Sequence, residues 1–193
     1  MSLASLPLRA FSQSEASRAG VNSRQLYRLL EKQHIERISR GLYRRTDLPP
    51  VDLDLTEIAA RRPDATICLE SALARHDLID TIPTHTDIAI PRGQKAATTQ
   101  AAVDWHVFDR ATFHIGRTLL DTGDAGLTIG LYSAERSIVD AFRLRSFAGY
   151  ETSIEALRNW LRRPASRPAS LFEIAQSLPR AIGPLRTALE ILT

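Results

Sequence analysis

The sequence predicts an α+β protein with a small N-terminal domain followed by a larger mixed α/β domain. Three observations lead to this prediction. Helix-capping motifs and helical spacing dominate residues 12–33, short strand-like runs are spread over residues 66–132, and the last third of the chain has a helical pattern. Leu48-Pro49-Pro50 stiffens the chain between the two regions. We therefore expect one domain at 1–48 and a second, with a small sheet and a helical C-terminal third, at 52–193.

The charge of the chain is divided unevenly between these two parts. The whole sequence carries 25 basic and 22 acidic residues, a net charge of +3. Residues 1–50 hold nine basic and four acidic side chains, whereas the other 143 residues hold 16 and 18, so the two net charges are +5 and −2. A concentrated positive segment is typical of a protein that binds a polyanion.

Composition excludes several classes of protein. The hydrophobic fraction of 44% and the charged fraction of 24% are those of a soluble globular protein, and no apolar run is long enough to span a membrane. The N-terminus lacks the pattern of a secretory signal. A single cysteine, Cys68, excludes an intramolecular disulfide and any multi-cysteine metal site. We expect a cytoplasmic protein with no metal and no cofactor.

The N-terminal segment predicts two short helices joined by a tight turn. Ser12 and Glu15 have the spacing of a capping box that starts a helix from about Gln13 to Ala19. Gly20 can supply the left-handed residue that ends this helix. Asn22 is a good N-cap for a second helix over residues 23–33. Two helices at this spacing indicate a helix-turn-helix, whose second helix enters the DNA major groove.

The second helix is amphipathic, and a basic hairpin follows it. Its apolar stripe is Leu26, Leu29, Leu30 and Gln33; its opposite face carries Arg24, Arg28 and Glu31, flanked by Gln25, Tyr27 and Lys32. Residues 34–45 contain strand formers around a possible turn at Ser39-Arg40-Gly41. A hairpin in this position is the wing of a winged helix-turn-helix, and its arginines (Arg37, Arg40, Arg44 and Arg45) are placed to meet phosphates or a minor groove.

These features predict a double-stranded DNA interface. We expect its contacts from Ser23, Arg24, Gln25, Tyr27, Arg28, Arg37, Arg40 and Arg44. Arg24 and Arg28 are the best candidates for groove contact, because Tyr27 could equally pack on the wing. The alternative is a small helical subdomain whose charged face only meets water.

The N-terminal segment resembles the winged domain of the AbiEi-type antitoxins, the regulators of AbiE (type IV) toxin–antitoxin pairs. The resemblance lies in the pattern SEA…AGV…QLYRLL…IERISRGLYR. One departure is that such sequences usually have a glycine between the recognition helix and the wing, where this chain has Gln33-His34.

The body predicts further helices and strands. The predicted helices are 53–62, 70–78, 134–145, a helix from a capping box at Thr152–Glu155 to Arg163, and two more within 170–192. The predicted strands are 87–90, 103–108 and 127–132, with a weaker fourth at 112–116, and 66–69 is a short apolar run.

The body contains no recognisable catalytic motif, and it carries neither a phosphate-binding glycine loop nor a metal-ligating HExxH. Asp104-x-His106 could contribute to a metal site, but a strand with Val103, Trp105 and Val107 inward explains the same alternation. Cys68 is expected as a small buried hydrophobe. Glu135, Arg136 and Asp140 indicate an internal ion-pair network, with a partner-binding helix face as the alternative.

The resemblance continues through TICLESALARHDL, IPTHTDIAIPRG and YSAERSIVDAFRLRS, so that it covers about residues 10–165. It implies an antitoxin, not an enzyme, that represses its own operon by binding operator DNA. It also implies that the C-terminal domain counteracts a nucleotidyltransferase-like toxin, without indicating which residues face that toxin. Two alternatives stay open: a DNA-acting nuclease-like enzyme, and a winged-helix regulator that senses a small ligand.

Overall fold

The computed structural model describes residues 3–192, apart from the side chains of residues 147 and 148. The described chain forms two compact units. The first contains residues up to 65 together with 97–102 and 120–129, and the second contains 66–96, 103–119 and the chain from 130 onward. The first unit thus extends past residue 48. The functional division into 1–48 and 52–193 stays a prediction, and its outermost residues 1, 2 and 193 lie outside the described part.

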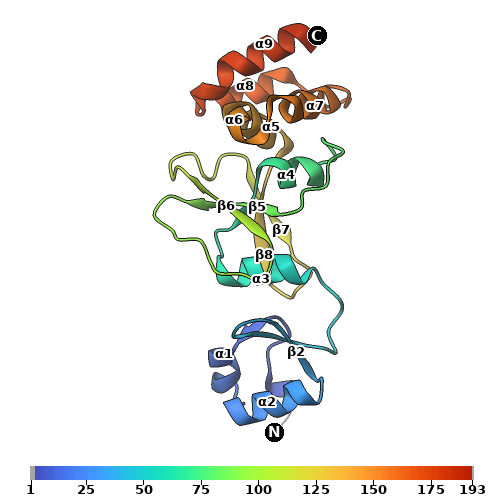
Figure 1. The fold of residues 1–193 in the computed structure, drawn as a ribbon, viewed down its shortest axis with the longest axis vertical. Coiled ribbons are helices and arrows are strands. Elements are labelled where there is room, and N and C mark those ends of the chain that lie inside the picture. Colours follow the sequence, from blue (N-terminus) through green and yellow to red (C-terminus); the bar gives the residue numbers. More distant parts are fainter. Residues whose placement is uncertain (1–2, 193) are drawn as a thin grey trace. The chain divides into compact units, whose positions relative to one another are not determined.

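The first unit begins with a helix-turn-helix and a β-hairpin (Figure 1). Its elements are η1 (Leu3–Ser5), β1 (Phe11–Ser12), α1 (Gln13–Arg18), α2 (Ser23–Glu31), β2 (Ile35–Ser39), β3 (Leu42–Arg45) and α3 (Leu53–Arg61). The hairpin strands β2 and β3 are antiparallel, and β1 pairs with β3, which gives the sheet order β1-β3-β2. This order of helices and strands is that of a winged helix-turn-helix.

Two apolar clusters hold the first unit together. The larger one is formed by the buried side chains of Leu6, Phe11, Ala16, Val21, Leu26 and Ile35. It joins α1, α2 and the wing, so the faces of the two helices that turn away from it are left to solvent. The smaller cluster joins Ala10, Ile38 and Leu42 to Ala60 of α3, which packs against β2.

The second unit contains a five-stranded mixed sheet and a helical region. Its elements are β4 (Thr66–Ile67), α4 (Leu69–Arg75), β5 (Thr86–Pro91), β6 (Val103–Phe108), β7 (Arg117–Asp121), β8 (Thr128–Tyr132), α5 (Ala134–Arg143), α6 (Arg145–Ala148), α7 (Tyr150–Leu161), α8 (Pro168–Gln176), η2 (Pro179–Ala181) and α9 (Ile182–Leu192). The strand order is β6-β5-β4-β8-β7, with β5–β6 and β4–β8 parallel and β4–β5 antiparallel. The end of β7, the start of β8 and the turn between them, residues 120–129, belong to the first unit.

The helical region forms around α5. Helices α7, α8 and α9 pack against it (Figure 1), and their apolar faces meet in a core that includes Ile138, Phe142, Trp160, Leu171 and Leu185. An α+β architecture with small sheets and a helical C-terminal third is therefore confirmed. No helix within residues 3–192 combines the length and the apolar character that a membrane span requires.

Several predicted elements need correction. Residues 112–116 form turns, and the fourth long strand is β7 at Arg117–Asp121. The expected capping box at Thr152 is wrong, because α7 already begins at Tyr150 after Gly149, without a side-chain cap. On β6, Val107 is 52% exposed whereas Phe108 is buried, so the expected inward position of Val107 is wrong as well.

Candidate nucleic-acid interface

The turn between α1 and α2 is fixed by local chemistry. The Ser12 side chain accepts a hydrogen bond from the Glu15 N–H, and Glu15 accepts one from the Ser12 N–H at 2.8 Å, which is the predicted capping box. Gly20 has φ 81°, and the Gly20 and Val21 amides donate to Ser17 and Ala16 at 3.0 and 2.9 Å. These two bonds form a Schellman motif, which ends α1 and sets the start of α2.

Burial raises the pKa of Glu15, but the hydrogen bonds from Ser12 and Arg9 outweigh it and bring that pKa down to about 2. The Arg9 guanidinium lies 2.6 Å from the Glu15 carboxylate. Glu15 therefore stays ionised at neutral pH, where its charge supports the start of α1.

Helix α2 presents a basic face to solvent. Asn22 and Gln25 form a second capping box at its start, in which the Gln25 side-chain oxygen accepts from the Asn22 N–H at 2.9 Å. Leu26 is buried in the core, while Ser23, Arg24, Tyr27 and Arg28 are exposed and Gln25 is half-buried. Within residues 3–192, no hydrogen bond or ion pair engages the side chains of Arg24 and Arg28. Their positive charge is therefore uncompensated.

Helix α2 ends at Glu31, two residues earlier than predicted, and Gln33 is not part of its apolar stripe. Gln33 has φ 58°, the left-handed conformation that costs an L side chain about 1–2 kcal/mol. Its N–H donates to Leu30, and the His34 N–H donates to Leu29, both at 3.0 Å, which is again a Schellman motif. Gln33 therefore occupies a left-handed backbone position between α2 and the wing, a conformation that favours glycine.

The wing is a tight hairpin. Gly41 has φ 75° at the turn between β2 and β3, as predicted. Arg37 and Arg40 are exposed, and the Arg37 Nε donates to the Ser39 carbonyl oxygen at 3.3 Å. This weak contact leaves most of the Arg37 fork available, so both guanidinium groups can meet a phosphate.

Arg44, which the sequence also predicts to contact DNA, is not available on the surface of the wing. Its side chain is only 4% exposed, and its Nε donates to Oδ1 of Asp124 at 2.8 Å. The same guanidinium donates to the Pro49 carbonyl oxygen and lies 3.8 Å from Glu36. A guanidinium held by three internal partners cannot reach a phosphate in this conformation. We correct the expected interface by leaving Arg44 out of it.

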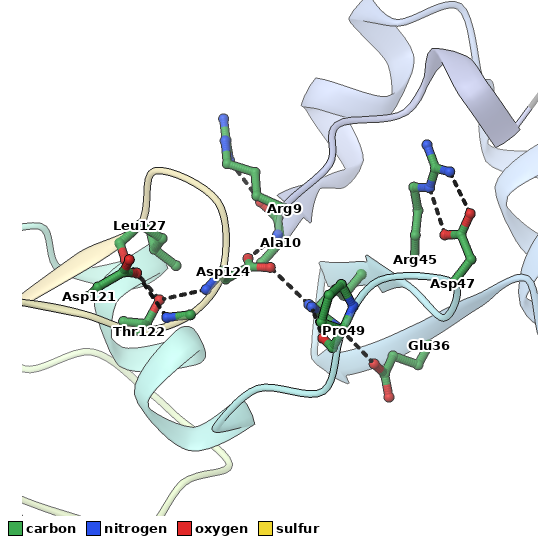
Figure 2. Close-up of polar contacts among 12 residues, drawn as sticks. Arg9, Ala10, Glu36, Arg45, Asp47, Pro49, Asp121, Thr122, Asp124 and Leu127 are labelled. Carbon is green, nitrogen blue, oxygen red and sulfur yellow. Dashed lines mark hydrogen bonds and ion pairs between the residues drawn. The ribbon is translucent and has the colours of Figure 1, made fainter.

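Arg45 is also paired within the protein. It forms a bidentate pair with Asp47, with distances of 2.9 and 2.6 Å (Figure 2). The hydrogen bonds from Arg45 lower the pKa of Asp47, although burial opposes them. The two arginines of β3 therefore stabilise the wing, and the cations left on the wing surface are those of β2 and the turn.

Sequence comparison agrees with this geometry. Residues 3–46 match the AbiEi regulator family model. That family is described as "Transcriptional regulator, AbiEi antitoxin", and the match runs from η1 through β3. No curated protein matches the chain.

Among solved structures, the RV2827C protein of Mycobacterium tuberculosis has a similar fold. The two chains superpose with a TM-score of 0.60 at 15% sequence identity, over 93% of this chain and 72% of that one. At this identity, the likeness concerns the fold alone. It extends over both units, whereas the AbiEi match is confined to the N-terminal segment.

Outside the AbiEi-like segment, the structure separates the two members of the Asp104-x-His106 pattern. Asp104 pairs with Nδ1 of His85 at 3.3 Å, whereas Nε2 of His106 lies 2.7 Å from Asp87. Among the described residues, no group of three His, Cys, Asp or Glu side chains is arranged to hold a metal ion. His85 and His106 therefore each pair with a different aspartate, and neither pair contains both Asp104 and His106.

Sequence reasoning missed the polar cluster around Asp87. Ser71 accepts a hydrogen bond from the Asp87 N–H at 2.8 Å, and a hollow of about 170 Å³ beside Asp87 is also lined by Glu70, His85 and Asp104. Burial, with a contribution from Asp87, raises the pKa of Glu70. These carboxylates are 17 residues or more apart along the chain, so their spacing gave no signal.

The predicted ion-pair network on α5 forms between Arg136 and Asp140 with Arg143 added, whereas Glu135, which was expected in it, accepts a hydrogen bond from the Trp160 indole N–H at 3.4 Å. Arg136 and Asp140 are fully buried, with Nε and Oδ2 2.8 Å apart, and Arg143 Nε donates to the other Asp140 oxygen at 2.9 Å. Arg136 also donates to two carbonyl oxygens and lies 4.5 Å from the centre of the Tyr132 ring. Cys68 is likewise buried as expected, and burial raises its pKa.

Proposed function

We propose that the chain is an AbiEi-type antitoxin that binds operator DNA through its winged helix-turn-helix, represses its own operon and counteracts a nucleotidyltransferase-like toxin through its body. The observation that carries this proposal is the basic face of α2, where Arg24 and Arg28 are exposed and uncompensated within the segment that matches the AbiEi regulator model.

The proposed DNA contacts follow from the exposure of each side chain. Helix α2 enters the major groove with Ser23, Arg24, Gln25, Tyr27 and Arg28, where an arginine fork can bind two acceptors of one guanine. Arg37 and Arg40 of the wing bind phosphates, which fixes the register of the protein on the duplex.

The toxin-directed part of the proposal rests on the family match and on the motif resemblance of the body. It is tested by expressing the chain together with the nucleotidyltransferase-like reading frame next to its gene. Growth that the toxin arrests and the chain restores supports the proposal. A neighbourhood without such a reading frame, or arrest that the chain leaves unchanged, contradicts it.

The operator-directed part is tested by nuclease footprinting on the DNA upstream of the chain's own gene. We expect one or more protected sites that disappear when residues Arg24 and Arg28 are both replaced by alanine. A uniform, unprotected pattern with the wild-type chain contradicts operator binding, whatever the body does.

A regulator that senses a small ligand is a second candidate, because one observation favours it. A hollow of about 400 Å³ beside α2 is lined by apolar side chains and by Arg28, Lys32 and His34. A small anion with an apolar body would fit this lining and would compete with DNA for Arg28. Benzoate and inorganic phosphate are suitable probes: DNA release by benzoate, but not by equimolar phosphate, supports this candidate, and no release by either contradicts it.

A further inference from the structure

Strand β6 forms one edge of the five-stranded sheet, where it pairs with β5 alone among the described strands (Figure 1). Its residues run in continuous parallel register with β5, without a bulge. The strand contains neither proline nor lysine. Proteins usually protect an edge with such devices, because the unpaired backbone groups of an edge strand are a template for another strand. The regular edge of β6 therefore indicates that a second strand can pair with it.

The backbone groups on the outer side of β6 belong to Val103, Trp105 and Val107. The Arg92 N–H donates to the Phe108 carbonyl oxygen at 2.8 Å, so the polar groups of Phe108 point toward β5. Because this direction alternates along a strand, the N–H and C=O groups of Val103, Trp105 and Val107 point away from β5. Within the described chain, no hydrogen bond outside the sheet ladder engages these three residues.

The side chains of the same three residues form an apolar stripe along the edge. Alternation along a strand places Val103, Trp105 and Val107 on one face of the sheet. Val107 is 52% exposed, and the other two are each partly exposed. The opposite face of the strand carries the polar residues Asp104 and His106. The edge thus offers apolar contact on one face and polar contact on the other.

The sequence of β6 is complementary to itself in an antiparallel arrangement. When two β6 strands pair with Trp105 at the centre, Val103 of one copy lies opposite Val107 of the other, and Asp104 lies opposite His106. An acid opposite an imidazole is favourable, whereas like charges directly opposite each other are destabilising. Centring the pair on Asp104 would place two carboxylates opposite each other, and centring it on His106 would do the same with two imidazoles. The charge pattern therefore favours the register centred on Trp105.

The intramolecular contacts of Asp104 and His106 are compatible with this pairing. Asp104 lies 3.3 Å from Nδ1 of His85, and the two side chains are 52% and 55% exposed, so this pair contributes little to stability. A carboxylate can also accept several hydrogen bonds at once. Nε2 of His106 lies 2.7 Å from Asp87, which fixes the imidazole ring on the edge strand. Both polar side chains are thus positioned at the edge before a second strand arrives.

We propose that two copies of this chain associate through β6 in an antiparallel, twofold-symmetric pair that joins their sheets into one continuous sheet. At the axis, the Trp105 N–H of each copy donates to the Trp105 carbonyl oxygen of the other, and the pairs of Val103 with Val107 repeat this pattern on either side. The pairs of Asp104 with His106 lie between them, at positions where opposing side chains approach more closely. This association goes beyond the proposed function and does not depend on DNA.

Sedimentation equilibrium of the full chain without DNA tests the association. A single strand edge is a small interface, so we expect a dissociation constant of about 1–100 µM. Val107→Lys should raise this constant by about tenfold, because the twofold axis places the introduced charge in the interface twice. The matched control is Leu119→Lys on β7, the opposite edge of the sheet, where Leu119 is 65% exposed. This control should leave the dissociation constant unchanged.

Two results of that experiment would overturn the proposal. The first is a wild-type chain that stays monomeric across this concentration range, including the case in which β6 instead pairs with a strand of a different protein. The second is an equal loss of association in the Leu119→Lys control, which would show that the association does not depend on the β6 edge.

Oxidative cross-linking tests the register. The Cα atoms of a hydrogen-bonded antiparallel pair are about 5.5 Å apart, a distance that a disulfide can span. A mixture of Val103→Cys and Val107→Cys chains should therefore form a disulfide-linked dimer, whereas either variant alone should form much less. The wild type measures the background, since its Cys68 is buried. A yield from either variant alone that equals the yield from the mixture overturns the proposed pairing.

Discussion

Arg44 and Asp124 form a buried ion pair between residues 80 positions apart in the sequence. Asp124 is 1% exposed and also accepts a hydrogen bond from the Ala10 N–H (Figure 2). A side chain from the tip between β7 and β8 thereby joins β3 to the segment before β1. The wing is thus completed by a part of the chain that lies far beyond residue 48.

The first prediction concerns this pair. Asp124→Asn leaves the buried Arg44 guanidinium without its counter-charge, so we expect the free energy of unfolding of the first unit to fall by about 3 kcal/mol. Urea denaturation measures the change. As a control, Asp121→Asn alters an exposed carboxylate at the same turn and should lower the free energy of unfolding by less than about 1 kcal/mol. Equal stability of the Asp124 variant and the wild type contradicts the role assigned to the pair.

The second prediction concerns the left-handed residue after α2. Gln33→Gly removes the cost of a side chain at φ 58° but increases the entropy of the unfolded chain, and the balance favours the variant by about 0.5–1 kcal/mol. Gln33→Val, with a β-branched side chain, should be less stable than the wild type. Thermal unfolding compares the three proteins, and a glycine variant that melts below the wild type would show that Gln33 makes a stabilising contact.

The third prediction follows from the pKa of Glu15, which is lowered from 4.5 to about 2. A carboxylate with a lowered folded-state pKa stabilises the protein above its unfolded pKa, and this contribution is lost as the pH falls through the folded value. Between pH 5 and 2, the free energy of unfolding of the wild type should therefore fall by about 1–2 kcal/mol relative to that of Glu15→Gln, which lacks this contribution at every pH. Urea unfolding at several pH values tests this, and parallel curves for the two proteins contradict it.

The fourth prediction concerns the nuclease alternative. The carboxylates around Asp87 are not arranged to hold a metal among the residues described, so we expect no cleavage of supercoiled plasmid with Mg²⁺ or Mn²⁺. Glu70→Gln and Asp87→Asn should then behave as the wild type does. Cleavage by the wild-type chain that both substitutions abolish would instead establish an enzyme at this site.

Features of the fold that depend on neighbouring residues could be predicted from the sequence. The capping box of Ser12, the N-cap Asn22 and the turn at Gly41 are all decided within four residues, and each is present. The capping pattern at Thr152 is the exception, because the chain continues the helix back to Tyr150 instead of starting it there.

Features that depend on distant residues could not be predicted. An arginine on a hairpin has the same local sequence whether it faces DNA or an aspartate from another part of the chain, so the burial of Arg44 gave no signal. The same holds for the parallel pairing of β5 with β6, which brings Asp87 and His106 together. For the interface itself, the spacing along α2 identified the exposed residues, because helical periodicity alone decides which side turns away from Leu26.

The most direct test of sequence reading by α2 is the ratio of affinities for the chain's own upstream DNA and for a scrambled duplex, measured by anisotropy at one salt concentration. Arg24→Ala and Arg28→Ala should each lower the affinity for the upstream DNA by about 1–3 kcal/mol while changing the affinity for the scrambled duplex much less. Arg92→Ala, outside the segment that matches the AbiEi model, should leave the ratio unchanged. A ratio that stays at the wild-type value in both α2 variants would contradict the account.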